Sequence, residues 1–583
     1  MLEVVAQRAR RLGAGAVQTL GVAAVIGRSF DLELVADVLE APEHEVLDVL
    51  EQAVATSLLR EHAQEPGSFT FAHALVEHAL YASLSAARRA HLHGRVGESI
   101  ERLYGSAAPE RVLELAHHFA AAVRPSAPGK AIDYACRAGR RAIEQLAPAE
   151  GCRWFTRGLE LVDQFSAPDD PARCELLIGL GEAQRQSGAP DFRRTLLDAA
   201  GLARSLGDGH RVARAVLATS RGLGSVSRPD EELISLLRAA SESLAETDPL
   251  RPRVMALLAA ELTFTSDVGT RRALVQEAVE LARAQADPHT LAFVLLYYVF
   301  ALWFPDTLAE RLEPSAEMVA AAQAAGDPPL LFHAAARHWT TMMEAGDLDQ
   351  AERCMEIMRG VVKTTPQPML RWRLLYYSAT RELLAGRLDD AEARATQSLE
   401  VGSAAGEADA AAFHAALTGF IRWEQGALAQ ALGFIDDALA RFPAFNIFQP
   451  LRALALCEAD RRQEAAALLS EGTANHFAAI PANALWASAM LTWSHVAARV
   501  GDRDAAAALF ERLQPFADQV AVTPVGAPGA IAHGLGLLAS THGRPALAEQ
   551  YFSQAIAVHE RLRAPLLIAR ARGDRAALAL SQP

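Results

Sequence analysis

Lysine is almost missing from this chain of 583 residues, in which Lys130 and Lys363 are the only two. The phosphate-binding loop of many nucleotide-hydrolysing proteins requires the frame Gly-x-x-x-x-Gly-Lys followed by Ser or Thr, because the lysine reaches the phosphates and the hydroxyl group binds Mg²⁺. Lys130 follows a glycine, but the upstream glycine and the hydroxyl are missing, and Lys363 lies in no such frame. ATP hydrolysis by this polypeptide alone is therefore not expected.

Cysteine and long apolar runs are scarce as well. The five cysteines lie far apart and form no Cys-x-x-Cys pair: Cys136, Cys152, Cys174, Cys354 and Cys457. This spacing predicts neither a disulfide framework nor a zinc site and is typical of a reducing, cytoplasmic compartment. The apolar stretch at residues 291–304 is shorter than the roughly 20 residues of a membrane-spanning helix, so we interpret it as a buried helix.

Aromatic residues make up 6% of the chain, although 51% of it is hydrophobic. Alanine and leucine account for the difference, and because they are the strongest helix formers the composition predicts an all-α protein. The chain is too long for one hydrophobic core, so it must form several domains or a solenoid that grows by stacking. The formal net charge of -14 argues against a general nucleic-acid binder and favours an acidic, protein-binding surface.

One short phrase occurs twice in the middle of the chain, at residues 345–352 and 385–392. The period of about 40 residues is typical of helical repeats. We interpret each copy as the turn of a helix hairpin, in which glycine takes the left-handed conformation that closes one helix and acidic residues begin the next. Weaker copies start at Gly426, Gly501 and Gly543.

These repeats predict an α-solenoid over residues 130–583, with about ten to eleven helix hairpins. Asp460 stands where the other copies have glycine, and aspartate tolerates the left-handed backbone at some cost. Residues 566–581 are expected to form a closing helix, because a solenoid needs a terminal unit that covers its last exposed face.

The first hundred residues follow a different pattern. Helices are expected at about 14–25, 32–40 and 43–55, followed by two short strands at 57–60 and 68–71. Three helices followed by a two-stranded wing form a winged helix. We therefore expect a winged-helix domain at residues 1–104, a linking helix and loop at 105–129, and the superhelix at 130–583.

Within this domain, Val22 to Phe30, Phe69 to Leu75 and Tyr81 resemble the winged-helix segment of bacterial STAND ATPases, the signal-transduction ATPases with numerous domains. In that family the segment follows a nucleotide-binding domain and precedes a tetratricopeptide-like superhelix. The family includes LuxR-type transcription regulators and cyclase-linked ATPases. The resemblance implies an α-solenoid of tetratricopeptide-like helix hairpins preceded by a small winged-helix domain.

The chain departs from the family because it has no phosphate loop. The resemblance therefore implies that this chain holds no cofactor by itself, and that ATP or ADP would be bound only through a separate ATPase domain packed against residues 1–100. His73 follows the second wing strand, where a histidine of some relatives reaches the nucleotide phosphate. The alternative is a hydrogen-bonded histidine that fixes the wing to the next helix.

Other residues match binding motifs less well. His91, His93, His117 and His118 have no carboxylate or cysteine at ligand spacing, so a metal site is not expected. The third helix of the winged helix, which would enter the major groove of DNA, carries Glu43, Glu45, Asp48 and Glu51, and there is no lysine or arginine between Pro42 and Gln52. Because carboxylates repel phosphates, direct binding of DNA is not expected.

Gly534, Gly536 and Ala539 match the dinucleotide-binding pattern Gly-x-Gly-x-x-Ala by letter. The match lies inside an expected repeat helix, and we expect no strand before it. A dinucleotide site needs a strand that leads into the glycine turn, so chance is the better explanation.

The aromatic residues of the middle repeats give the main suggestion of a ligand. Seven of them fall in the first helices of consecutive hairpins, which usually line the concave surface of a superhelix: Tyr297, Tyr298, Trp303, Trp339, Trp372, Tyr376 and Tyr377. This concentration predicts a groove for a protein or a small effector. For any single one of these residues, the alternative is packing in the core between helices.

These observations favour a regulatory, non-catalytic polypeptide, the sensor half of a STAND-type regulator, that binds a protein or small effector along its concave face. The alternative is a free-standing tetratricopeptide scaffold with a vestigial winged helix. A third hypothesis is a winged-helix DNA-binding regulator. No constellation of catalytic residues supports an enzyme, and no segment predicts a membrane partner.

Overall fold

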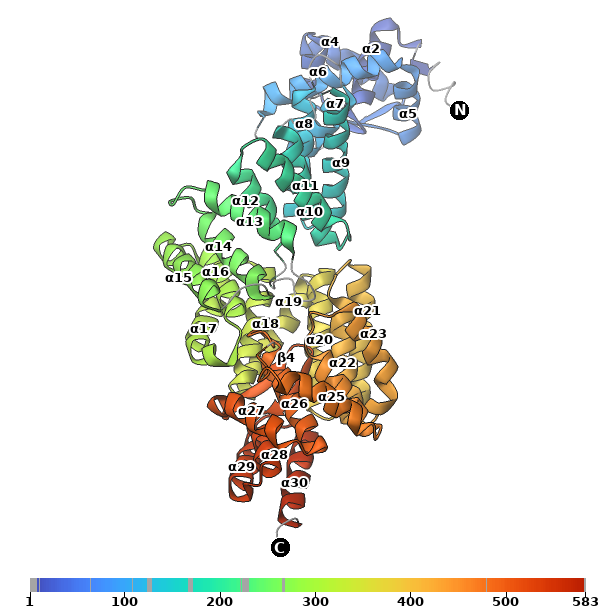
Figure 1. Cartoon of the computed structure of the whole chain (residues 1–583). Coiled ribbons are helices and arrows are strands. Elements are labelled where there is room, and N and C mark those ends of the chain that lie inside the picture. The colour runs from blue at the N-terminus through green and yellow to red at the C-terminus, as the bar shows by residue number, and fades with distance from the viewer. Residues whose placement is uncertain are drawn as a thin grey trace. The chain divides into compact units, whose positions relative to one another are not determined.

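The computed structural model describes residues 8–9, 11–62, 64–106, 109–122, 128–165, 171–220, 222, 230–264, 268–478 and 480–580. The chain divides into two compact units, Met1–Gln184 and Arg185–Pro583 (Figure 1). In the described ranges, no helix combines the length and the apolar character that crossing a bilayer requires.

The first unit begins with helices and strands in the order α2 (Ala14–Ile26), β1 (Ser29–Asp31), α3 (Leu32–Leu39), α4 (Glu43–Ala55), β2 (Leu59–Glu61) and β3 (Ser68–Phe71). The strands form one antiparallel sheet in the order β1-β3-β2. The three helices and the last two strands lie close to the positions that the sequence predicts. Strand β1 was not expected, because three residues are too few to show an alternating pattern. It is anchored by the buried ring of Phe30, which packs 6.2 Å from Phe69 and 5.6 Å from Phe71.

The rest of this unit is helical: α5 (Ala74–Ser83), α6 (Ala86–Tyr104), the 3₁₀ turn η1 (Pro109–Arg111), α7 (Val112–Ala121), α8 (Gly129–Glu144), α9 (Pro148–Phe165) and α10 (Pro171–Ser187), within which the second unit begins. One buried core extends from Leu20 through Phe119 to Ala183, so it also includes helices that the sequence assigns to the repeats. Residues 107–108 and 123–127 of the linking segment expected at 105–129 lie outside the described residues.

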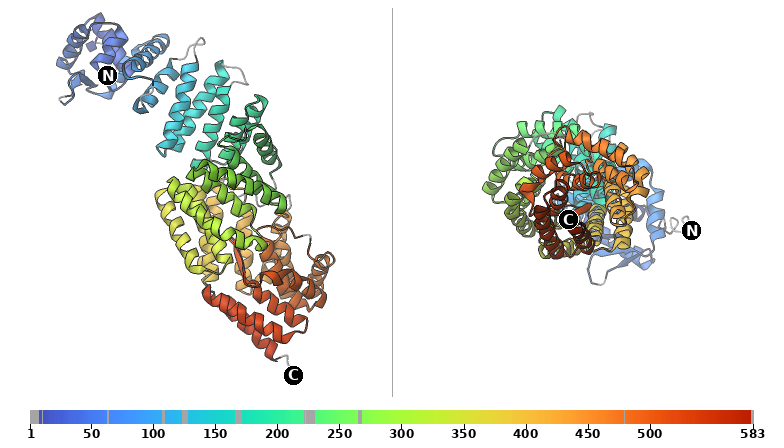
Figure 2. Two further views of the ribbon diagram at one scale, coloured as in Figure 1. Left: turned by 90° about the vertical axis from the view of Figure 1, so that its left-hand side faces the viewer. Right: turned by 60° about the horizontal axis from the view of Figure 1, so that its bottom comes forward.

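The second unit is built from successive helices joined by short turns. These are α11 (Phe192–Ser205), α12 (Gly209–Ala218), α13 (Glu231–Ser243), α14 (Arg251–Glu261), η2 (Leu262–Phe264), α15 (Val268–Gln285), α16 (Pro288–Ala301), η3 (Pro305–Thr307), α17 (Leu308–Ala325), α18 (Pro328–Glu344), α19 (Leu348–Thr364), α20 (Pro368–Leu384), α21 (Leu388–Ala404), α22 (Ala410–Glu424), η4 (Leu428–Ala431), α23 (Leu432–Arg441), α24 (Phe448–Glu458), α25 (Arg462–Thr473), α26 (Trp486–Val500), α27 (Arg503–Leu513), η5 (Gln514–Phe516), α28 (Ile531–Thr541), α29 (Pro545–Arg561) and α30 (Pro565–Leu580). Each helix packs against its neighbours in the sequence, and the pairs stack side by side along a curved path (Figure 2). The fold is thus an α-solenoid of tetratricopeptide-like helix hairpins, with α30 at the position of the expected closing helix.

The turns between paired helices follow the chemistry that the repeated phrase predicts. Gly346 and Gly386 have φ values of 74° and 75°, in the left-handed region that glycine adopts without a steric penalty. Asp460 takes the same conformation in place of glycine, with φ 58°. In the first copy the aspartate that follows the glycine caps the next helix, because the Asp347 carboxylate accepts a hydrogen bond of 3.0 Å from the backbone N–H of Gln350.

One part of the second unit is not helical. Strands β4 (Val520–Thr523) and β5 (Gly526–Ala530) form an antiparallel hairpin in which every strand residue is buried. The hairpin packs against α18, α20, α22, α26, α28 and α29, and β4 is seen among these helices in Figure 1. The sequence predicts only helices here. This short run contains two prolines and two glycines, and it shows no alternation between apolar and polar residues because both of its faces are covered.

Candidate functional site

The helices that carry the expected groove residues are buried on nearly all sides. In α16 the buried residues run without interruption from Ala292 to Ala301, and α18 and α20 are almost as completely covered. A helix that is apolar around its whole circumference must be enclosed by other elements. Here the second helices of the pairs cover one side, and the hairpin β4–β5 contacts α18 and α20.

All seven aromatic residues that the sequence points to are buried, and three of them meet at one place. Trp303, Tyr376 and Tyr377 line a single cavity, whereas Tyr297, Tyr298, Trp339 and Trp372 are not among the described residues that line it. Tyr297 packs 5.0 Å from Phe293, and Trp339 lies edge-on to Tyr377 at 5.1 Å. The arrangement therefore differs from an exposed groove, because the hairpin, which the sequence pattern does not predict, fills the space beside these helices.

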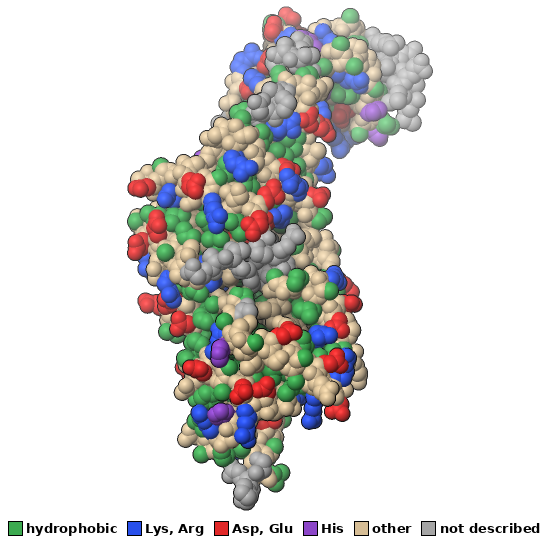
Figure 3. Space-filling view, viewed as in Figure 1, with side chains coloured by type: hydrophobic (Ala, Val, Ile, Leu, Met, Phe, Trp, Pro, Cys, Tyr) green, Lys and Arg blue, Asp and Glu red, His purple; other side chains and the backbone are tan. Residues whose placement is uncertain are grey.

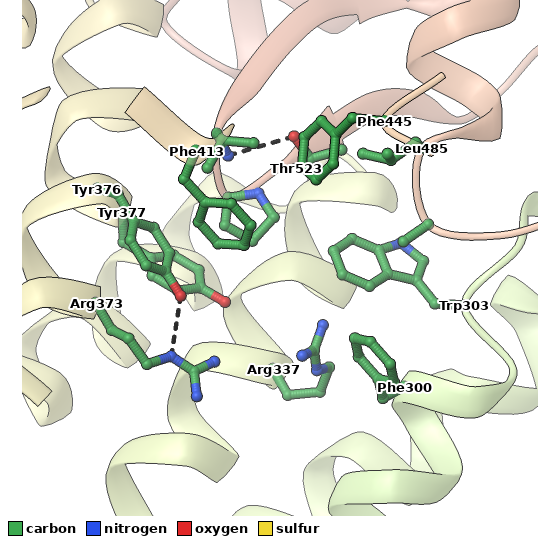
Figure 4. Close-up of a pocket in the computed structure, with 13 residues that line it drawn as sticks. Phe300, Trp303, Arg337, Arg373, Tyr376, Tyr377, Phe413, Phe445, Leu485 and Thr523 are labelled. Carbon is green, nitrogen blue, oxygen red and sulfur yellow. Dashed lines mark hydrogen bonds between the residues drawn. The ribbon is translucent and has the colours of Figure 1, made fainter. Parts of the chain in front are cut away.

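The cavity lies between α16, α18, α20 and the tip of the hairpin (Figure 4). Its apolar walls include Phe300, Trp303, Phe413 and Phe445, and residues 523–525 of the hairpin tip form another side. The volume is about 30 Å³, enough for one or two water molecules and far below the space that a drug-sized ligand fills. A ligand that binds with the hairpin in place must be very small.

Arg337 supplies a positive charge to this cavity. Its side chain is 2% exposed, and its Nε and Nη1 atoms have no hydrogen-bond partner. The guanidinium lies 4.8 Å from the ring centres of both Phe300 and Trp303, in the geometry of a cation–π contact. Burial lowers the pKa of this guanidinium to about 10, although Tyr377 opposes the shift, so the group stays charged at neutral pH.

Arg373 lies next to it and is fully buried as well. Its Nε donates a hydrogen bond of 3.0 Å to the Tyr376 hydroxyl, and its Nη1 donates one of 2.9 Å to Nδ1 of His333. An arginine can only donate, so Nδ1 of His333 must be the unprotonated nitrogen. Burial, with a smaller effect from Arg373, lowers the pKa of His333 well below its ordinary value. His333 is therefore neutral and adds no charge.

Trp303 is held in place by a buried ion pair. Its Nε1 donates a hydrogen bond of 2.9 Å to Oε1 of Glu344, while Nη1 of Arg311 donates one of 2.8 Å to Oε2 of the same carboxylate. The two charged side chains are only 1% and 6% exposed. Glu344 is thus neutralised by Arg311 and fixes the indole that forms one wall of the cavity.

The tip of the hairpin is fixed by polar and steric contacts. The Thr380 hydroxyl on α20 donates a hydrogen bond of 2.5 Å to the Pro524 carbonyl. Gly526 lies so close to α22 that a Cβ atom there would be 2.0 Å from Cδ2 of Phe420. Glycine is therefore required at this position, because the Phe420 ring is buried and has no free space to move into.

Replacing Gly526 by alanine is expected to destabilise the second unit by roughly 1–3 kcal/mol, the usual cost of overpacking a core. Thermal unfolding of the full chain, followed by tryptophan fluorescence, measures the effect. Gly360→Ala is the matched control, because Gly360 lies in α19 with no other atom within 4 Å of the added Cβ. An unchanged unfolding temperature in Gly526→Ala would contradict the close contact with Phe420.

The other residues that the sequence singled out have structural roles. His73 is exposed and caps α5, since its Nδ1 accepts a hydrogen bond of 3.3 Å from the backbone N–H of Leu75. Gly534 and Gly536 lie inside α28, where added Cβ atoms would be 2.5 Å from Leu491 and 2.6 Å from Phe552. Strand β5 does precede this helix, which corrects the expectation of no strand. The glycines nevertheless serve close helix packing.

Two histidines that the sequence places 25 residues apart meet inside the first unit. Nδ1 of His93 lies 2.9 Å from Nδ1 of His118, and the Tyr81 hydroxyl lies 3.0 Å from Nε2 of His93. Both side chains are buried. Among the described residues no group of three or more His, Cys, Asp or Glu side chains could hold a metal ion. All five cysteines are described and none forms a disulfide.

Charges of both signs are mixed over the visible face of the second unit, without a large field of either sign (Figure 3). The second unit has ion pairs between neighbouring helices, for example Arg272 with Glu310 and Arg422 with Glu392. On this face, no basic surface suited to nucleic acid is seen.

No protein-family model matches the chain, and no curated protein sequence matches it. Solved structures with some similarity include a STAND protein with a tetratricopeptide repeat sensor from Pyrococcus horikoshii, with 10% identity over 78% of this chain and a TM-score of 0.35. The match covers 62% of that protein, less than two thirds of its length.

Two other structures show a similar degree of likeness. The Cut9–Hcn1 hetero-tetramer of the APC/C has 13% identity over 83% of this chain and 93% of its own, with a TM-score of 0.39. A monomeric mutant of IFIT1 with m7Gppp-AAAA has 11% identity over 73% of this chain and 90% of its own, with a TM-score of 0.28. Likenesses at this level support no argument about what the chain binds.

Proposed function

We propose that the chain is a non-catalytic, cytoplasmic regulatory module, the sensor half of a STAND-type regulator that acts with a separate nucleotide-binding domain. The observation that carries this proposal is the small cavity beside the first helices of the repeats, which Arg337, Tyr377 and Trp303 line. A buried charge without a hydrogen-bond partner is costly for packing alone, so a cavity beside it is suited to sensing a very small ligand.

The N-terminal elements support the same proposal. A winged helix has the order helix, strand, two helices and two further strands, and residues 14–71 follow this order. In the STAND family this domain lies between the ATPase domain and the superhelix. We assign it to residues 1–104, the link to 105–129 and the superhelix to 130–583. LuxR-type transcriptional regulation is one output that such a module would control, through its partner rather than by direct contact with DNA.

The exposed position of His73 at the start of α5 is compatible with contact to a nucleotide held by the partner. The backbone N–H of Leu75 already uses Nδ1, so the contact would be made through Nε2. The separate ATPase domain would pack against residues 1–100 to bring the phosphate there.

Neither ATP nor ADP is expected to change the unfolding temperature of the isolated chain, because no phosphate loop is present to bind them. Differential scanning calorimetry with and without each nucleotide checks this result.

Co-purification with a phosphate-loop ATPase partner should depend on nucleotide or ligand, whereas a simple scaffold would bind its partners without either. A clear increase in the unfolding temperature with ATP alone would contradict the proposal that a separate domain binds the nucleotide.

A further inference from the structure

The cavity is lined by positively charged residues without negatively charged ones. None of the 13 residues that line it is acidic, although two of them, Arg337 and Arg373, are arginines. The nearby carboxylate of Glu344 is already paired with Arg311 at 2.8 Å. In the part of the chain that the structure describes, Arg337 therefore has no negative partner.

A buried cation without a partner is expensive, because the protein interior solvates a charge poorly. The aromatic faces of Phe300 and Trp303 offset part of this cost, but a cation–π contact leaves the N–H groups of the guanidinium without acceptors. Arg337 retains at least two unsatisfied nitrogen atoms, Nε and Nη1. An anion in the cavity would supply both the missing charge and the missing acceptors.

A second donor points to the same place. The Tyr376 hydroxyl accepts its hydrogen bond from Arg373, so its own hydrogen is left to donate. Burial raises the pKa of this hydroxyl, which keeps that hydrogen in place at neutral pH. In Figure 4 the Arg337 guanidinium lies beside Phe300 and Trp303, and Tyr376 and Tyr377 lie across the cavity from these two rings.

The size and the donors of the cavity select the kind of anion. A volume of about 30 Å³ holds one small group, and the walls apart from the arginines and the tyrosine hydroxyls are mainly apolar. A carboxylate has two oxygens and a single charge, which one guanidinium and one hydroxyl can satisfy. A phosphate group at neutral pH carries more charge and three acceptor oxygens, for which these donors are too few.

We infer that this cavity is an anion site that takes the carboxylate group of a small organic acid, with the Arg337 guanidinium as its charge partner. The inference rests on the proposed function and deepens it, because it names the chemical class of the effector. With the hairpin tip in place, acids as small as formate and acetate fit the available volume.

The test is a titration of the full chain with formate and acetate at constant ionic strength, read out by tryptophan fluorescence and by the unfolding temperature. Trp303 borders the cavity, so its emission should change saturably, and both acids should raise the unfolding temperature. Formamide and acetamide, which have the same shapes without the charge, should have no effect. Chloride and inorganic phosphate at the same ionic strength should have much smaller effects.

Arg337→Met is the decisive variant, because methionine keeps an apolar side chain over Phe300 and Trp303 but removes the charge. It is expected to weaken acetate binding by at least about tenfold, the effect of losing one charge-assisted hydrogen bond. Arg359→Met is the matched control, since Arg359 is exposed on α19. If Arg337→Met does not fold, Arg337→Lys, which keeps the charge but loses the planar fork, should bind acetate more weakly than the wild type.

Equal responses of the wild type to acids and amides would overturn the inference, and so would acetate binding that survives unchanged in Arg337→Met. A response to chloride or phosphate as large as that to acetate would also overturn it, because it would indicate charge screening and not a carboxylate site. None of these three results would contradict nucleotide-dependent association with an ATPase, which is the test of the proposed function. Loss of that association with intact acetate binding would instead contradict only the proposed function.

Discussion

Replacing Glu344 by alanine is expected to destabilise the second unit by roughly 3–5 kcal/mol, the cost of breaking a buried ion pair on one side. The Arg311 guanidinium is 1% exposed and would keep its charge without a carboxylate partner. Trp303 would lose the acceptor of its Nε1 hydrogen at the same time. The measurement is urea-induced unfolding of the full chain, followed by the tryptophan emission of this unit.

The control for this prediction is an ion pair at the surface. Arg283 and Glu317 lie 2.7 Å apart, but their side chains are 54% and 34% exposed, so Glu317→Ala should cost at most about 1 kcal/mol. The double variant Arg311→Met with Glu344→Met removes both charges and should recover much of the stability lost in Glu344→Ala. Equal losses in Glu344→Ala and Glu317→Ala would contradict the buried geometry.

The first unit is expected to lose stability as the pH falls from about 6.5 to 4. Burial is the largest cause that lowers the pKa of His93 to about 4 and that of His118 to about 3, and the neighbouring His117 adds to both shifts. In the unfolded chain a histidine has a pKa near 6.5. Below that pH the unfolded state binds protons that the folded state excludes, so the stability present at neutral pH is progressively lost.

The expected slope is about 1.4 kcal/mol per pH unit for each histidine, which amounts to about 3 kcal/mol for His93 by pH 4. Hydrogen exchange of peptides from α6 and α7 at pH 7, 5.5 and 4.5, corrected for the intrinsic exchange rate, measures the local opening free energy. His118→Leu removes one of the two groups and should flatten the slope. His44→Gln should leave the slope unchanged because His44 is exposed. Constant protection of these peptides between pH 7 and 4.5 would show that His93 and His118 do not titrate as described.

The repeat architecture could be predicted from the sequence because its signals are local. A glycine at φ 74° and an aspartate that caps the next helix act within a few residues, so the phrase around Gly346 specifies its turn wherever it occurs. The period then determines that hairpins stack. The same holds for the helices of the first unit, which follow from their apolar periodicity.

The candidate site could be predicted only in part. The concentration of aromatic residues in the first helices points to Trp303, Tyr376 and Tyr377, and these three residues line one cavity. Arg337 and Arg373 do not stand out in the sequence, since an arginine in an arginine-rich chain carries no signal by itself. Burial without an acidic partner is what distinguishes Arg337, and burial of a charged residue is not visible in composition.

The sequence by itself determined the helix pairs, their turns and their closing helix, because each depends on residues that are close neighbours in the chain. Only the tertiary structure decided that β4–β5 fills the space beside α18 and α20, that His93 meets His118, and that Glu344 joins Trp303 to Arg311. These contacts join residues that are 25 to more than 100 positions apart. Their stability comes from excluding water around specific partners, a property that exists only once distant segments have packed together.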